Sequence, residues 1–373
     1  MLPSEGSGGL GVRGRGEGEG YSPHEGCPLC RTTIAVADLK PTVIEGKLAD
    51  GTGRVRAFKE EDCTLHIYPP VEGIEWKEVD IGHRPCIATD EFGMAYTGPL
   101  ARDGVSPSDG AEGSIMLSGK NSLDDYKAET CLMLTQAEGG GISYEPIPCP
   151  LDTRDRDSLS ATRVGDTVYL FGPWVQGRPN TLRAYSIRDK TWRRIRKKGG
   201  TPWPAPRRCH SSFCLGGKLY IVGGFDDDFN THKDMFVFDP KTEVFTELKN
   251  PVSVACAAAV VVGKTAHLIG GQNNRHLVYT EKGGIRQLRK MNFEVSSAGA
   301  VSVGTNIYLM GGDAHGKQVR VYDTLTKRWS RLADLPIPLW SCRACLISSH
   351  TVLLHDYHGT LLGTLPTMPH RDH

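Results

Sequence analysis

Side chains suited to molecular recognition gather after four copies of a short glycine motif. Tryptophan and arginine anchor many protein interfaces, and other polar side chains add directed hydrogen bonds. In each copy these residue types follow a glycine pair or its equivalent, where a loop is expected. The candidate binding residues are Trp174, Arg178, Asp226, Asp228, Asn230, His232, Gln272, Asn273, Arg275 and His315. Loops are polar in most proteins, so the shared placement supports this hypothesis more than any single residue does.

Two groups of residues have types that bind metal ions. Asp226 and Asp228, together with His232, offer oxygen and imidazole ligands for a divalent cation. Cys27 and Cys30 have the spacing of half a zinc site, but a structural zinc site needs four ligands and no second pair is near them in the sequence. We therefore expect no metal and no other cofactor.

The search for a catalytic motif finds none of the common types. The sequence has no Gly-x-Ser-x-Gly elbow, no His-Glu-x-x-His pair and no phosphate-binding glycine loop. This favours a non-catalytic binding module and leaves an enzymatic role open.

Composition limits the class of partner and the compartment. Among 373 residues, Lys+Arg 44 against Asp+Glu 43 leaves a formal charge of +1, so no overall field attracts nucleic acid or a membrane surface. No secretory signal precedes the eleven cysteines, which indicates reduced thiols in the cytoplasm. The basic run at 193–198 leaves a nuclear location as the alternative. We expect a monomer that binds a protein or peptide, with neither nucleic acid nor membrane as a partner.

The elements that position the candidate loops recur along the chain. Gly172, Gly223, Gly270 and Gly311 follow a β-rich segment in each copy and lie 51, 47 and 41 residues apart. Another glycine stands seven positions earlier each time. Two aromatic residues seven positions apart then follow in three copies: Tyr185 and Trp192, Phe238 and Phe245, Tyr322 and Trp329. Each copy thus predicts four strands, which is the content of one propeller blade.

Weaker copies extend the pattern in both directions. The segment 90–99 matches 164–173, so its residues are expected to form a second strand, followed by a long connection over 100–128. Residues 345–354 resemble the first two strands of a last blade, which an amino-terminal strand would complete. Outer strands are expected near 76, 144, 192, 245, 285 and 329, so six blades are favoured. Residues 32–48 could instead complete the first blade and leave a seventh at the carboxyl end.

The glycine pair, the β-rich strand before it and the spaced aromatic residues after it resemble the kelch repeat. The resemblance is good over 157–335 and weak over 31–150. It implies an all-β propeller whose loop face binds a protein or peptide partner. Sialic-acid mutarotases resemble this chain in length and repeat type. The spacing of Asp228 and His232 is similar to part of the iron-binding motif of kelch-like specifier proteins, but Gly224 stands where those proteins carry an acidic residue. A small propeller enzyme or sugar-binding protein with a pocket at the channel mouth is therefore the alternative.

Domain bounds follow from composition and from the repeats. Residues 1–30 are rich in glycine and charge and are expected to be disordered, as are 366–373. The propeller is expected over 31–365. Cys209, Cys256 and Cys342 fall at equivalent repeat positions, which predicts small buried side chains there.

Overall fold

The computed structural model divides the chain into two compact units, Met1–Gly73 and Ile74–His373. The structure describes residues 43–47, 54–59, 65–68, 74–79, 93–100, 107, 113–118, 130–136, 141–148, 158–172, 174, 178–249, 253–271, 274–312, 316–356 and 358–366. In the first unit, three antiparallel strands form one sheet: β1 (Val43–Lys47), β2 (Arg54–Lys59) and β3 (Leu65–Tyr68).

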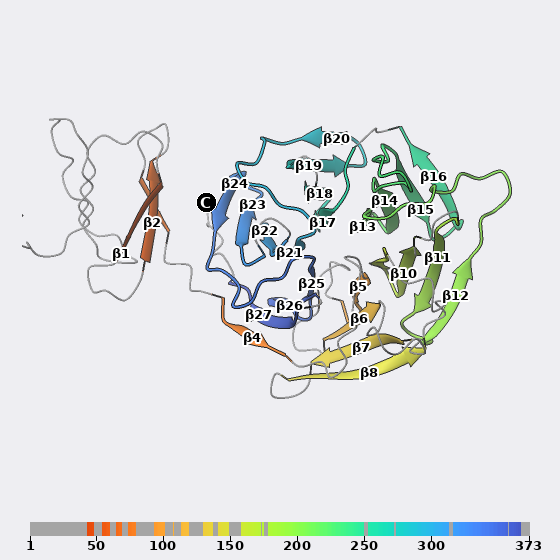
Figure 1. Ribbon diagram of the computed structural model, residues 1–373, viewed down its shortest axis with the longest axis horizontal. Coiled ribbons are helices and arrows are strands. Elements are labelled where there is room, and N and C mark those ends of the chain that lie inside the picture. Colours follow the sequence, from red (N-terminus) through yellow and green to blue (C-terminus); the bar gives the residue numbers. More distant parts are fainter. Residues whose placement is uncertain are drawn as a thin grey trace, which may run out of the picture. The chain divides into compact units, whose positions relative to one another are not determined.

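The second unit is an all-β propeller of six four-stranded antiparallel blades (Figure 1). The first two blades contain β5 (Gly93–Tyr96), β6 (Ser114–Ser118), β7 (Thr130–Gln136), β8 (Ile142–Pro148), β9 (Ser160–Val164), β10 (Thr167–Gly172), β11 (Thr181–Ser186) and β12 (Thr191–Ile195). The third and fourth contain β13 (Ser211–Leu215), β14 (Lys218–Val222), β15 (Met235–Asp239), β16 (Val244–Leu248), β17 (Ala257–Val262), β18 (Thr265–Gly270), β19 (Arg275–Thr280) and β20 (Gly284–Gln287).

The last two blades show how the ring closes. The fifth contains β21 (Gly299–Val303), β22 (Asn306–Met310), β23 (Val319–Asp323) and β24 (Arg328–Arg331). The sixth contains β25 (Arg343–Leu346), β26 (Thr351–His355), β27 (Thr360–Thr364) and, from the other end of the chain, β4 (Trp76–Glu78). An early strand therefore pairs with a late one, and each innermost strand contacts the innermost strand of the next blade all the way round. Closure in this way supplies the fourth strand of the sixth sheet.

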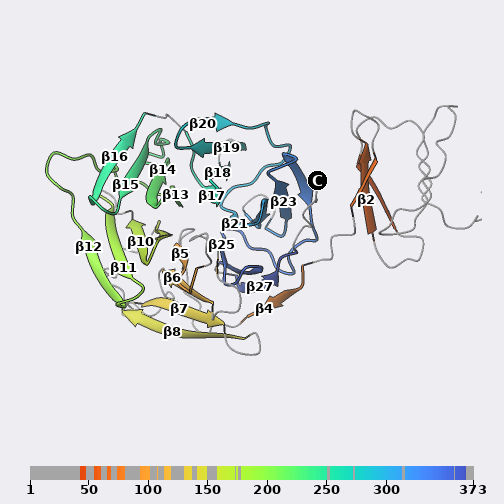
Figure 2. The same ribbon diagram turned by 180° about the vertical axis from the view of Figure 1, so that it is seen from behind.

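Strand order within each blade runs from the centre of the ring to its rim. Strands β5, β13, β17, β21 and β25 lie nearest the centre of the ring, whereas β4, β8, β12, β16 and β20 lie nearest its rim, in the views from both sides (Figures 1 and 2). The second strands are almost fully buried because both of their faces pack against neighbouring blades. The loop after each second strand therefore joins the second strand from the centre to the third.

The glycine pairs are explained by a close approach of two backbones. At Gly223 and Gly270 the backbone has positive φ (60° and 80°), and an added Cβ would lie 1.9 and 2.3 Å from the carbonyl oxygens of Val254 and Val295. The N–H of the second glycine of each pair donates to that same carbonyl, at 2.8 Å for Gly224 and 2.9 Å for Gly271. Glycine is required because any side chain would displace the segment that links one blade to the next.

The spaced aromatic residues pair across the two outer strands of a blade, as the sequence predicted. Tyr185 is opposite Trp192, with ring centroids 4.9 Å apart, and the pairs Phe238–Phe245 and Tyr322–Trp329 repeat this at 5.0 Å. In the fourth blade Ile285 takes the place of the second aromatic residue, opposite Tyr279. These rings form much of the apolar packing between adjacent blades.

The six-bladed propeller predicted from the sequence is confirmed, including all six outer strands and closure by an amino-terminal strand. One strand assignment is wrong. Gly93–Tyr96 is the innermost strand of its blade, and Ser114–Ser118, expected within a connecting loop, is the second. The error arose because the glycine after Tyr96 imitates the glycine that ends a second strand. The propeller range was expected to begin at residue 31, whereas the strands between 43 and 68 pair only with one another.

Candidate functional site

The loop between β14 and β15 projects an aromatic side chain into solvent. After the glycine pair, Phe225 pairs with Arg208 through two backbone hydrogen bonds of 2.8 and 3.0 Å. The carboxylate of Asp226 then accepts from the backbone N–H of Asp228 (3.0 Å) and of Asn230 (2.8 Å), which folds the loop tip. At that tip Phe229 has a left-handed backbone (φ 62°) and is 68% exposed.

An arginine lies between this phenylalanine and a tryptophan of the previous blade. The guanidinium carbon of Arg208 is 3.8 Å from the ring centre of Phe229 and 4.7 Å from that of Trp174. The indole Nε1 of Trp174 donates to Asp227 at 2.8 Å, which fixes the ring. We call Trp174, Arg208 and Phe229 the arginine–aromatic cluster. Its members come from the loop after β10, the link before β13 and the loop after β14, so two adjacent blades build it.

The guanidinium of Arg208 has donors that the cluster does not use. Its Nε is buried and has no hydrogen-bond partner, and no ion pair of this side chain is found within the part of the chain that the structure describes. Stacking on two rings stabilises a guanidinium by about 0.5–2 kcal/mol without consuming its N–H groups. The cluster therefore combines an exposed apolar surface with a cation that can still donate to an acceptor.

The preceding residue, Arg207, has an opposite role. Its side chain is fully buried and makes a two-point contact with the carboxylate of Asp234, at 2.5 and 3.0 Å. It also donates to the carbonyl of Gly223 at 3.0 Å. The side chain of Asn180 accepts from the N–H of Arg207 (2.6 Å) and donates to its carbonyl (3.1 Å). These contacts hold the link rigidly and so fix the position of Arg208.

The structure places the sequence-predicted residues in several different surroundings. Trp174 lies in the cluster, Asp226 and Asn230 shape its loop, and Arg178 and Asp228 are exposed. His232 is half-buried and its Nε2 lies 3.0 Å from the carbonyl oxygen of Pro206. Arg275 is the first residue of β19, opposite Gly270, and is half-buried. Gln272, Asn273 and His315 lie outside the described residues.

Sequence reasoning overlooked the two most informative residues of the cluster. Arg208 and Phe229 are not among the residues predicted from the sequence. A signal was available for Phe229, because a large apolar residue within an acidic loop has no strand pattern that would bury it. No such signal marks Arg208, whose position depends on the fold of the link.

Three of the described histidines, His210, His267 and His276, are buried within the propeller. His276 lies within β19, and its Nε2 is 2.9 Å from Nδ1 of His267. Burial lowers the pKa of His267 to about 4 and that of His276 to about 3. Burial, followed by the positive charge of Arg207, also lowers the pKa of His210 to about 3. All three are therefore neutral at pH 7 and form part of the core.

Two of the residues whose types could bind a metal ion make contacts within the protein instead. The Asp226 carboxylate folds its own loop, and His232 contacts a backbone carbonyl. Within the described ranges, no group of three His, Cys, Asp or Glu residues has a geometry that could hold a metal ion. Cys27 and Cys30 lie outside those ranges.

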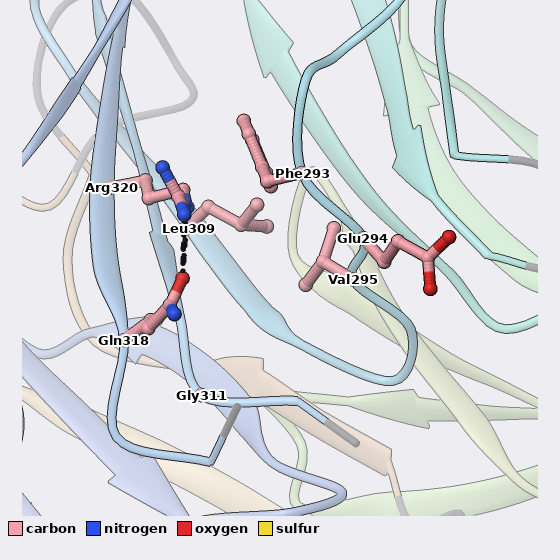
Figure 3. Close-up of a pocket in the computed structure, with 7 residues that line it drawn as sticks. All are labelled: Phe293, Glu294, Val295, Leu309, Gly311, Gln318 and Arg320. Carbon is pink, nitrogen blue, oxygen red and sulfur yellow. Dashed lines mark hydrogen bonds between the residues drawn. The ribbon is translucent and has the colours of Figure 1, made fainter. Parts of the chain in front are cut away.

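A second arginine lies over an aromatic ring in the fifth blade, beside a shallow pocket (Figure 3). The guanidinium carbon of Arg320 is 3.9 Å from the ring centre of Phe293. Here the guanidinium is engaged, because Nε and Nη2 both donate to Oε1 of Gln318, at 3.1 and 2.7 Å. The pocket is lined by Phe293, Glu294, Val295, Leu309, Gly311, Gln318 and Arg320, and its empty space of about 220 Å³ includes open solvent. None of these seven described lining residues is a histidine or an aspartate.

Comparisons with known proteins give one family of repeats. Residues 148–271 match the model described as "KLHDC2/KLHL20/DRC7 Kelch-repeats domain", and residues 295–336 match the "Kelch motif" model. Among solved structures, a chain described as "Structure of YjhT" shares the fold, with a TM-score of 0.55 and 13% sequence identity, over 76% of this chain and 94% of that one.

Curated relatives match over part of their length. Acyl-CoA-binding domain-containing protein 4 of Arabidopsis thaliana is 28% identical over 209 residues, which are 48% of this chain and 31% of that protein. Kelch domain-containing protein 3 of Homo sapiens is 31% identical over 134 residues, or 32% of this chain and 34% of that protein. The chain thus spans about a third of the length of these relatives. Within the described residues, no helix is long and apolar enough to span a membrane.

Proposed function

We propose that this chain, a kelch-repeat β-propeller, is a non-catalytic binding module that captures a protein or peptide segment on its loop face. Phe229 supplies the apolar contact, and Arg208 donates hydrogen bonds to an acceptor group of the partner. Trp174 holds the arginine from its other side. Arg178, Asp228 and Asn230 are exposed, and we assign them to the polar rim of this surface.

One observation supports this proposal above the others. The arginine–aromatic cluster has two features that cost stability: an exposed phenyl ring on a left-handed backbone, and a buried Nε with no partner. A non-glycine residue in that backbone region costs about 1 kcal/mol or more, and an unsatisfied buried donor costs about 1–3 kcal/mol. A partner that covers Phe229 would gain binding free energy from apolar surface that folding leaves exposed, and the half-buried guanidinium of Arg208 would place a positive charge beside it. Aromatic residues and arginines in such positions dominate the energetics of many interfaces.

The experiment is a selection with a matched counter-selection. A random-peptide display library is panned on the full chain, and the enriched peptides are then tested on the double variant Arg208→Met/Phe229→Ser. The control is Arg320→Met, which removes a stacked arginine elsewhere on the propeller. We expect enriched peptides to lose at least about 10-fold in affinity for the double variant and to bind the control as they bind the wild type. Peptides that bind the double variant equally well would contradict the proposal.

A further inference from the structure

Two cysteines are adjacent where the third and fourth blades meet. Cys209 precedes β13 and Cys256 precedes β17, each seven positions before the glycine of the following turn. The backbone N–H of Cys256 donates to the carbonyl of Cys209 at 2.9 Å. Both residues have the same left-handed backbone, with φ of 55° and 56°. The two side chains therefore leave neighbouring backbones from equivalent conformations.

This arrangement has the dimensions of a disulfide. The single hydrogen bond of 2.9 Å, together with standard backbone bond lengths, keeps the two Cα atoms within about 6.8 Å of each other. Disulfides join cysteines whose Cα atoms are about 4.4–6.8 Å apart. A bond between Cys209 and Cys256 would thus need little movement of the two blades. Both residues are reduced in this structure.

The other described thiols are less suited to reaction. Cys131 and Cys342 are fully buried, and burial raises the pKa of Cys342 and of Cys345 to about 12. Burial also raises the pKa of Cys214. Cys209 and Cys256 are only half-buried, although their repeat positions had predicted burial. Because the thiolate is the reactive form and must be reached by the reagent, exposure favours this pair.

We propose that Cys209 and Cys256 form a vicinal dithiol site that small disulfide oxidants convert into a disulfide between two blades. With oxidised glutathione, the thiolate of one cysteine attacks the glutathione disulfide and releases one reduced glutathione. The second thiolate then attacks the protein sulfur of this mixed disulfide and releases the other. The two glutathione thiolates released take up the two protons that the protein thiols lose. In sum, the two protein thiols are oxidised to one disulfide, and one glutathione disulfide is reduced to two thiols.

The bond would join segments that are 47 positions apart in the sequence, which precede the first strands of the third and fourth blades. A link across such a loop restricts the unfolded chain more than the folded one. We expect the thermal midpoint of the full chain to rise by about 5 °C on oxidation.

The test is site mapping by mass spectrometry. The reduced full chain is incubated with oxidised glutathione, the remaining thiols are alkylated, and the peptides are identified. We expect a joined peptide that contains Cys209 and Cys256, and loss of alkylation at both. In Cys209→Ser, the reaction should stop with one glutathione on Cys256, and in Cys256→Ser with one on Cys209, because the second attack is no longer possible.

The repeat supplies a matched relocation of the pair. Ser297 has the same backbone conformation (φ 54°), and its N–H donates to the carbonyl of Cys256 at 2.9 Å. The double variant Cys209→Ser/Ser297→Cys should therefore close between positions 256 and 297. Wild-type protein in which Cys209 and Cys256 both remain alkylated, or each retains a separate glutathione, would overturn the proposal. Failure of the relocated pair to close would contradict its geometric basis.

Discussion

Arg208 and Arg320 both lie over an aromatic ring, yet their surroundings differ. Arg320 covers Phe293, which is only 9% exposed, and its guanidinium donates twice to Gln318. Arg208 covers Phe229, which is 68% exposed, and its Nε has no partner. The contact between Arg320 and Phe293 thus stabilises the fifth blade. The contact between Arg208 and Phe229 leaves the phenyl ring exposed and the Nε of the arginine without a hydrogen-bond partner.

The difference teaches that a stacked arginine does not by itself mark a binding surface. What distinguishes Arg208 is that the loop and the link around it are held by hydrogen bonds in which its side chain takes no part. The loop tip is folded by Asp226, and the link is held by Arg207. Removal of Arg208 should therefore cost little stability, whereas removal of Arg320 should cost more.

The largest expected effect concerns the support beneath Arg208. Asp234→Asn leaves the fully buried guanidinium of Arg207 without its counter-charge. Breaking a buried ion pair in this way costs about 3–5 kcal/mol in the free energy of unfolding, measured by urea denaturation. The control is Asp334→Asn, whose partner Arg331 is half-exposed, and it should cost no more than about 1 kcal/mol. Equal losses in the two variants would show that Arg207 does not hold the link.

Acid should weaken the core beneath Arg320. The ring of His276 is 5.6 Å from that of Trp329, which in turn lies 5.1 Å from Phe293. The folded-state pKa of His276 (about 3) and of His267 (about 4) lies below the ordinary value of 6.5, so the unfolded chain binds more protons between these limits. Stability is therefore complete above about pH 6.5 and falls as the pH drops toward 4, by on the order of 3 kcal/mol.

The control for this pH dependence is the double variant His267→Leu/His276→Leu. Its free energy of unfolding, measured by denaturation from pH 7 to pH 4, should decline less steeply than that of the wild type. Some decline should remain, because the folded-state pKa of His210 is also low, at about 3. An unchanged slope would mean that the histidine pair does not titrate as described.

A smaller effect separates the two arginines directly. Arg320→Met removes two hydrogen bonds to Gln318 and the contact with Phe293, so it should lower the free energy of unfolding by about 1–2 kcal/mol. Arg208→Met should change it by less than about 0.5 kcal/mol, since loss of the stacking is offset by removal of an unsatisfied buried donor. Parallel urea denaturation measures both. A larger loss for Arg208→Met would reverse the comparison.

The sequence predicted the fold more fully than the site, for physical reasons. Gly223 and Gly270 are required by a backbone contact that recurs at Gly311, and the pairing of Tyr185 with Trp192 recurs in two other blades, so repetition made both visible. Gly93–Tyr96 was misplaced because a single copy of a glycine motif does not specify which strand it ends. Its true partner, Ser114–Ser118, lacks the motif.

The candidate site depends on contacts that do not repeat. Arg207 and Arg208 are identical in type and adjacent in sequence, yet one is buried against Asp234 and the other lies between two rings. Only the path of the link between two blades decides which side chain turns inward.

The measurement that tests the central claim most directly is the affinity of one selected peptide for three forms of the full chain, by titration calorimetry. The account predicts that Arg208→Met/Phe229→Ser weakens binding at least about 10-fold while its thermal midpoint stays close to that of the wild type. Arg320→Met should lower the thermal midpoint and leave the affinity unchanged. Unchanged affinity in Arg208→Met/Phe229→Ser would contradict the assignment of this cluster as the recognition site.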